Sequence, residues 1–155
     1  MFKYKKVLIV CPGGAVTGGP EALHHLAHLL CEIGVDARMV YTPFENKFDV
    51  PEAYGNFNIS IGHYEDVEGN LIVFPEVYPM QALKVKHAKA AIWWLSLDNF
   101  LERRHLSRFR DVVRYWKGVL RGRRPLMGVS ALKNIIHFSQ SHYSSQYLTE
   151  KGLNV

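Results

Sequence analysis

The sequence lacks any hydrophobic run that approaches the roughly 20 residues needed to cross a bilayer. The residues Met1–Lys6 are basic, and the apolar run that follows, Val7–Cys11, ends at Pro12. That run is too short for the core of a signal peptide and fits a first β-strand better. We therefore expect a cytoplasmic protein without a membrane-spanning helix.

Cysteine is scarce, with 2 in 155 residues, and neither a CxxC pair nor a Cys/His finger spacing is present. Two reduced, buried thiols, Cys11 and Cys31, are therefore expected, and no structural zinc site. His24 and His28 have the spacing of two metal ligands on one helix face, but His25 follows His24 where zinc proteases carry Glu. Because no third ligand is evident, we predict no metal site and place these histidines at the border of the helix surface.

Acidic residues are almost missing from 102–124, where only Glu102 and Asp111 oppose nine basic residues. The segment 102–124 has a net charge of +7. Because the whole chain has a net charge of +5, the remaining residues carry 5 − 7 = −2. A predicted helix over about 100–120 also has an apolar face, and two interpretations stay open: contact with an anionic membrane surface at its inner, cytoplasmic side, or ordinary packing on a sheet. Nucleic acid is not expected, because no aromatic residues are interleaved as a stacking platform. The basic residues are Arg103, Arg104, Arg108, Arg110, Arg114, Lys117, Arg121, Arg123 and Arg124.

Strand and helix patterns alternate along a chain that is 48% hydrophobic and 21% charged, a globular composition. A strand over 5–11, a glycine loop, a helix starting at Pro20 and ending at Gly34, and a strand over 37–41 form a βαβ unit. Further strands are predicted over 58–61, 71–74, 90–95 and 135–138, with helices over 80–85, from Asp98 or Asn99 to about 120, and over 141–151. The pattern predicts an α/β fold: one Rossmann-like domain over 1–155, with an open, mostly parallel sheet and helices on both faces.

Four glycines, Gly13, Gly14, Gly18 and Gly19, join the first strand to the first helix. The P-loop lysine and hydroxyl are missing, and so is the GxGxxG dinucleotide fingerprint. A glycine-rich loop before a helix N-terminus suits contact with a phosphate, although Glu21 would repel one placed directly on the helix. The alternative is a tight turn that needs glycine for its geometry alone.

The segment CPGGAVTGGPEALHHLAHLLCEIGVDARMVY resembles the opening of nucleotide-sugar glycosyltransferases from bacterial polysaccharide pathways. IVFPEVYP, AAIWWLSLDNF and HFSQSHYSSQYLTEKG resemble later segments of the same N-terminal domain, in the same order. The resemblance implies two facing Rossmann-like (GT-B) domains, of which this chain is the acceptor-side half and the donor-binding half is absent. It also implies transfer of a sugar from a nucleotide donor to a glycan or lipid-linked acceptor, without a cofactor or an obligatory metal. The donor would bind mainly to the missing domain, and the four glycines would lie near its phosphates when the two domains close. Many relatives carry histidine where this chain has Pro75, so no catalytic histidine is carried over.

Polar and aromatic residues at the ends of predicted strands complete the expected acceptor-side cleft, because ligands of open α/β sheets bind there. Asp98 is the best candidate for a catalytic contact with an acceptor hydroxyl, and capping of the following helix is its alternative role. Trp93 and Trp94 alternate across a strand, so one would fill the core and the other could stack on a sugar. The expected cleft residues are Glu76, Trp94, Asp98, Ser139 and Ser141.

Two other classes of protein remain as alternatives. The first is a non-catalytic Rossmann-like module that binds a glycan or an anionic membrane surface. The second is a nucleotide-dependent oxidoreductase or regulator of the flavodoxin-like class, which the missing fingerprints disfavour.

Overall fold

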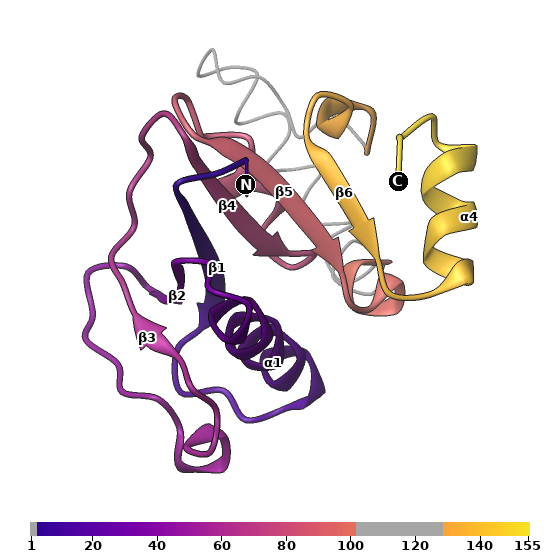
Figure 1. The fold of residues 1–155 in the computed structure, drawn as a ribbon. Helices are drawn as coiled ribbons and strands as arrows, with labels where there is room; N and C mark the ends of the chain where they lie inside the picture. The colour runs from indigo at the N-terminus through magenta and orange to yellow at the C-terminus, as the bar shows by residue number, and fades with distance from the viewer. Residues whose placement is uncertain (1–2, 102–128) are drawn as a thin grey trace, which may run out of the picture.

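The structure, a computed structural model, describes residues 3–101 and 129–155 and contains one open sheet of six strands (Figure 1). All neighbouring strands run parallel, in the order β3-β2-β1-β4-β5-β6. The prediction of a Rossmann-like α/β fold is confirmed, with a wholly rather than mostly parallel sheet. The strands are β1 (Lys6–Pro12), β2 (Ala37–Thr42), β3 (Ser60–Ile61), β4 (Asn70–Pro75), β5 (Lys89–Trp94) and β6 (Ile136–Ser139).

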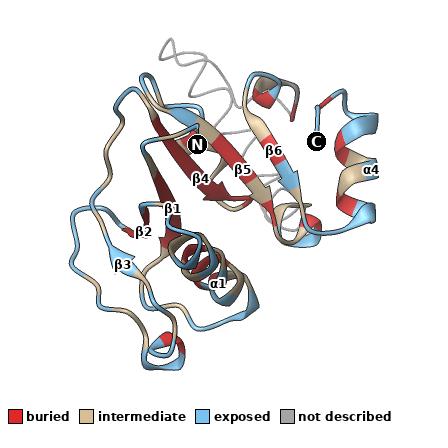
Figure 2. Cartoon of the chain, in the orientation of Figure 1, coloured by how far each residue is buried: buried red, intermediate tan, exposed pale blue. Residues whose placement is uncertain are grey.

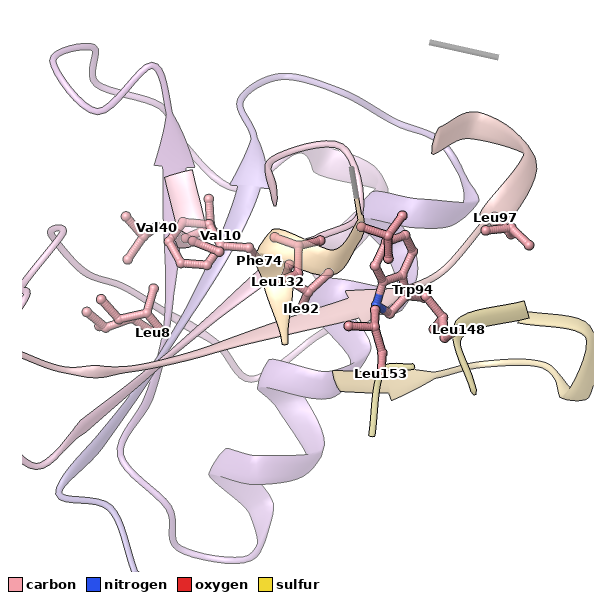
Figure 3. Packing of buried hydrophobic residues seen from close by; sticks show 13 residues of the cluster. Leu8, Val10, Val40, Phe74, Ile92, Trp94, Leu97, Leu132, Leu148 and Leu153 are labelled. Carbon is pink, nitrogen blue, oxygen red and sulfur yellow. The ribbon is translucent and has the colours of Figure 1, made fainter. Parts of the chain in front are cut away.

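Helices cover both faces of the sheet because successive side chains of each strand point to opposite sides. On one face Val7 and Ile9 pack with Leu23 and Ala27 of α1 (Gly18–Glu32). On the other face a larger cluster joins the strands to α2 (Pro79–Ala82), the 3-10 helix η2 (Val129–Leu132) and α4 (His142–Glu150) (Figure 3). Strand β4 is buried throughout and β1 at all but its two end residues, and exposure rises toward both edges of the sheet (Figure 2).

The first helix, α1, ends where predicted but begins earlier. Gly34 adopts φ +80°, its amide donates to Cys31 O, and Val35 N donates to Leu30 O, which is the Schellman arrangement. At the other end the helix begins at Gly18, so Pro20 is its third residue rather than its first. Proline is tolerated there because the first amides of a helix have no intrahelical acceptor.

The last helix, α4, has the boundaries that its sequence predicts. Ser141 is the N-cap, and its Oγ accepts from Ser144 N at 3.2 Å. Gly152 ends the helix at φ +76°. The predicted strand over 58–61 and helix over 80–85 are both shorter than expected, at two and four residues.

Asp66 joins the turn before β4 to the turn before β5. Its carboxylate accepts hydrogen bonds from Lys86 N, His87 N and Ala88 N at 2.8, 2.9 and 2.8 Å. Partial burial alone would raise the pKa of Asp66, but these three amides hold it below its ordinary value. The carboxylate therefore fastens two consecutive crossovers of the sheet.

We expect Asp66→Ala to lower the free energy of unfolding by about 1–2 kcal/mol, because three amides lose a charged acceptor that water only partly replaces. The measurement is urea unfolding at neutral pH. Glu68→Ala is the matched control, since Glu68 is exposed in the same turn and makes no hydrogen bond among the described residues. Equal losses for the two variants would contradict the role assigned to Asp66.

None of the helices within residues 3–101 and 129–155 has the length and hydrophobicity needed to cross a bilayer. The nine basic residues between 102 and 124 lie outside the described part of the chain, as does most of the helix predicted to carry them.

Candidate functional site

The candidate site lies at the carboxyl edge of the sheet, where β1 and β4 are neighbours. From β1 the chain adds β2 and β3 toward one edge of the sheet, and it then returns to add β4, β5 and β6 toward the other edge. The direction of the crossovers therefore changes between β1 and β4. In open parallel sheets ligands bind at this switch point. The glycine loop follows β1 directly, and Glu76 follows β4, so the sheet brings together two of the features predicted for the site.

The four glycines of the loop differ in what requires them. A Cβ atom at Gly13 would overlap with the ring of Phe48, so this glycine is explained by close packing. Gly14 adopts φ +69°, a conformation that side chains disfavour. By contrast, among the described residues a Cβ at Gly18 would meet nothing within 4 Å, and one at Gly19 only Leu95 Cδ1 at 3.9 Å. Neither packing nor backbone geometry therefore explains the last two glycines.

The amides of Gly18 and Gly19 are the available donors at the start of α1. Thr17, the N-cap, makes no side-chain capping bond, Pro20 has no N–H, and Glu21 N already donates to Thr17 O at 3.0 Å. Within residues 3–101 and 129–155 the Gly18 and Gly19 amides have no acceptor. These two amides and the helix dipole attract an anion, while the exposed carboxylate of Glu21 in the same turn opposes one.

Residues 43–59, which we call the strap, connect β2 to β3 and pack against the glycine loop. Phe48 lies on Gly13 and 6.0 Å from the Tyr41 ring. Tyr54, in the 3-10 helix η1 (Glu52–Tyr54), donates to Thr17 O at 3.2 Å. Sequence analysis missed the strap, because the loop between two strands carries no pattern that shows what it covers.

The outer end of the strap is fastened to the solvent-facing flank of α1. The Phe57 ring stacks with those of His25 and His28, at 5.6 and 5.5 Å between centroids. Asn58 N donates to His28 Nδ1 at 3.1 Å, and its side-chain amide donates to Glu32 Oε1 at 3.1 Å. His28 therefore holds the strap in place, and the described residues contain no cluster of three potential metal ligands.

His24 is fully buried, which corrects the prediction that it borders the helix surface. Its Nδ1 is 2.6 Å from Pro20 O and its Nε2 is 2.7 Å from Tyr41 Oη. Burial lowers the pKa of His24, and the hydrogen bond to Pro20 only partly offsets this effect. The apolar spacing of α1 could not show this burial, because it depends on the Tyr41 hydroxyl lying opposite on β2.

Glu76 is a buried carboxylate, 3% exposed, directly after β4. Its Oε2 accepts from Leu95 N at 3.3 Å, and its own amide donates to Trp93 O at 3.2 Å. These bonds join the carboxyl ends of β4 and β5. Glu76 thus lies at the predicted edge of the sheet, where it shapes the backbone after β5.

Asp98 is exposed in the first turn of a helical segment that begins at Leu97, so the structure leaves it free to meet a ligand. The prediction that Asp98 or Asn99 caps this helix is wrong. Ser96 is in the capping position, and its Oγ accepts from Asn99 N at 3.3 Å.

Trp94, predicted for the cleft, lies in the core instead and is 0% exposed. Its indole N–H donates to His137 Nδ1 at 3.1 Å, and its ring meets Phe100 edge-on at 5.0 Å between centroids. Trp93 points to the face of the sheet that α1 covers and remains partly exposed. Which tryptophan is buried depends on strand register, which the dipeptide alone does not specify.

Ser139 and Ser141 lie at the carboxyl end of β6, as predicted, but their hydroxyls serve the turn into α4. Ser139 Oγ donates to Ser141 O at 3.2 Å, and Ser141 Oγ donates to Ser144 Oγ at 3.0 Å. At the same edge, Thr42 Oγ1 at the end of β2 donates to Tyr78 Oη after β4 at 2.8 Å, a bridge that sequence analysis did not predict.

Comparison of the chain with models of protein families, with curated proteins and with solved structures gives no match.

Proposed function

We propose that this domain is the acceptor-side half of a glycosyltransferase that moves a sugar from a nucleotide donor to a glycan or a lipid-linked acceptor. The support is the juxtaposition of the Gly18 and Gly19 amides with the switch point of an all-parallel sheet. These glycines leave space that no other part of the described chain fills. The diphosphate of a nucleotide sugar is a group of suitable charge to approach them.

In this proposal the described residues bind and position rather than react covalently. The two amides would stabilise charge that grows on the departing diphosphate, which costs no reorganisation because they are already fixed at a helix start. Asp98, exposed beyond β5, is the candidate to accept the proton of an acceptor hydroxyl. Glu76 is bonded to Leu95 N and orients the backbone that leads to Asp98.

Gly18→Ala and Gly19→Ala test this function against a purely structural role for the loop. Both variants are expected to keep or slightly raise stability, by up to about 1 kcal/mol, because alanine restricts the unfolded chain and fits the space. Both should weaken binding of uridine diphosphate and its sugars at least about tenfold, because a methyl group would stand between the amides and the phosphates. Amide chemical shifts at 18 and 19 during nucleotide titration are the measurement.

Gly14→Ala is the control, and it should lower the free energy of unfolding by about 1–2 kcal/mol, because a side chain is strained at φ +69°. A loop that serves geometry alone would show stability losses at Gly18 and Gly19 as well, with no nucleotide response in the wild-type chain. Shifts produced by oligosaccharides but by no nucleotide would instead favour the glycan-binding module.

A further inference from the structure

Both ring nitrogens of His24 are engaged in a fully buried setting. A carbonyl oxygen can only accept, so Nδ1 carries the proton and donates to Pro20 O at 2.6 Å. Burial lowers the pKa of His24, so the ring is neutral, Nε2 is the acceptor, and the Tyr41 hydroxyl donates to it at 2.7 Å. The hydrogen bonds thus define a neutral imidazole in one tautomer, which ties β2 to the first turn of α1.

A second tyrosine reaches the same turn from the strap. The centroids of the Tyr54 and His24 rings lie 4.2 Å apart, and the Tyr54 hydroxyl donates to Thr17 O at 3.2 Å. The carbonyls of Thr17 and Pro20 bracket Gly18 and Gly19 in the chain. The Thr17 carbonyl is therefore held from outside the helix by Tyr54, and the Pro20 carbonyl is held by His24 of the same helix, which Tyr41 braces from β2. The side chain of Thr17 contributes no cap.

We propose that His24 is a positioning residue which, with Tyr41 and Tyr54, holds the first turn of α1 so that the Gly18 and Gly19 amides are fixed toward the carboxyl edge of the sheet. The inference rests on the proposed function, because it assigns those amides to the donor diphosphate. Without these contacts, two adjacent glycines at an uncapped helix start would lose order. Binding of the diphosphate would then have to order them, and the conformational entropy lost would weaken its affinity.

The contribution of His24 is geometric rather than electrostatic. Burial lowers its pKa, so the ring is neutral at pH 7 and offers no charge to an anion. Burial likewise raises the pKa of Tyr41, which keeps its hydroxyl a donor. The three side chains therefore act by orienting the Thr17 and Pro20 carbonyls.

The chain contains a matched control on the opposite face of the sheet. His137 is also buried and also bonded at both nitrogens, to the Trp94 indole and to Leu132 O at 3.0 Å. Its partners Trp94 and Leu132 belong to the cluster on that face, whereas α1 packs on the other face. His24→Leu and His137→Leu therefore remove similar buried hydrogen bonds, but only the first removes contacts to the start of α1.

The experiment measures backbone order parameters of Gly18 and Gly19 and the dissociation constant for uridine diphosphate, both by NMR. In His24→Leu we expect the order parameters to fall from the rigid range, about 0.85, toward the flexible range below about 0.6. The dissociation constant should rise about tenfold or more, whereas His137→Leu leaves both quantities unchanged. Tyr54→Phe, which keeps the ring and should fold, is expected to show a smaller change of both quantities in the same direction.

His24→Asn is the rescue variant, because its amide can donate near the place of Nδ1 and should recover part of the order. Unchanged order parameters in both His24→Leu and Tyr54→Phe, or an equal loss in His137→Leu, would overturn the positioning role. A wild-type chain with ordered glycines but no response to uridine diphosphate would instead refute the assignment of the Gly18 and Gly19 amides to the donor diphosphate, and with it the support for the proposed function. In that case the order parameters of the variants would still decide the role of His24.

Discussion

Trp94→Ala is expected to lower the free energy of unfolding by about 3–5 kcal/mol, the range for large aromatic residues in a core. The side chain is fully buried in the cluster that joins β5 to Leu97, Leu132 and Leu148 (Figure 3). The substitution also leaves His137 Nδ1 buried without its indole donor. Urea unfolding followed by far-ultraviolet circular dichroism measures the loss.

Trp93→Ala is the control, because it removes the same side chain from the adjacent position. Trp93 lies on the opposite face and is partly exposed, so its loss should be less than half as large. If both variants lose the same stability, the register that turns Trp94 into the core is wrong.

Acidification is expected to destabilise the fold, starting as pH falls below the ordinary histidine pKa of 6.5. Burial lowers the pKa of His24 and of His137, so in this range the unfolded chain binds protons that the folded chain does not. Stability therefore rises with pH across the window and levels off above it, with a slope of up to about 1.4 kcal/mol per pH unit for each histidine. Protonation of His137 would also set a second N–H against the Trp94 indole N–H.

Chemical unfolding between pH 4.5 and 8 measures this slope in the wild type, in His24→Gln and in His137→Gln. In each variant the slope of stability against pH should fall by the contribution of the substituted histidine. The stability of the variant at pH 8, where both histidines are neutral, gives the loss that is independent of protonation. The lowered pKa of Asp66 acts in the same direction but only at more acidic pH, where carboxylates titrate. A stability that stays constant from pH 8 to pH 5 would contradict the buried, neutral state of both histidines.

Sequence patterns predicted the fold well because the relevant signals are local. Short β-branched runs such as Val7–Cys11 and 71–74 marked buried strands, and the spacing of Leu23, Ala27 and Leu30 marked a helix between parallel strands. The glycines that end helices, Gly34 and Gly152, and the serine that begins one, Ser141, also appear where predicted, since capping depends on a few neighbouring residues. The glycine loop was identified for the same reason.

The candidate site was predicted only in part. The position of Glu76 and Asp98 beyond β4 and β5 follows from strand boundaries, which the sequence shows. The burial of Trp94 and the contact of Phe48 with Gly13 do not follow from those boundaries, because each depends on side chains meeting across the fold. The Ser96 cap is local, but Asp98 and Asn99 nearby are equally suitable capping residues, so the sequence did not single it out.

By itself, then, the sequence determined a parallel α/β sheet with a glycine loop at its carboxyl edge, because strand period, helix period and turn residues act over a few positions. Only the tertiary structure decided which glycines are needed for packing and which leave space free. It alone also decided that His24 turns inward to Tyr41, 17 residues away along the chain. Such contacts depend on strand register and on the path of the strap, and these arise only when distant segments pack together.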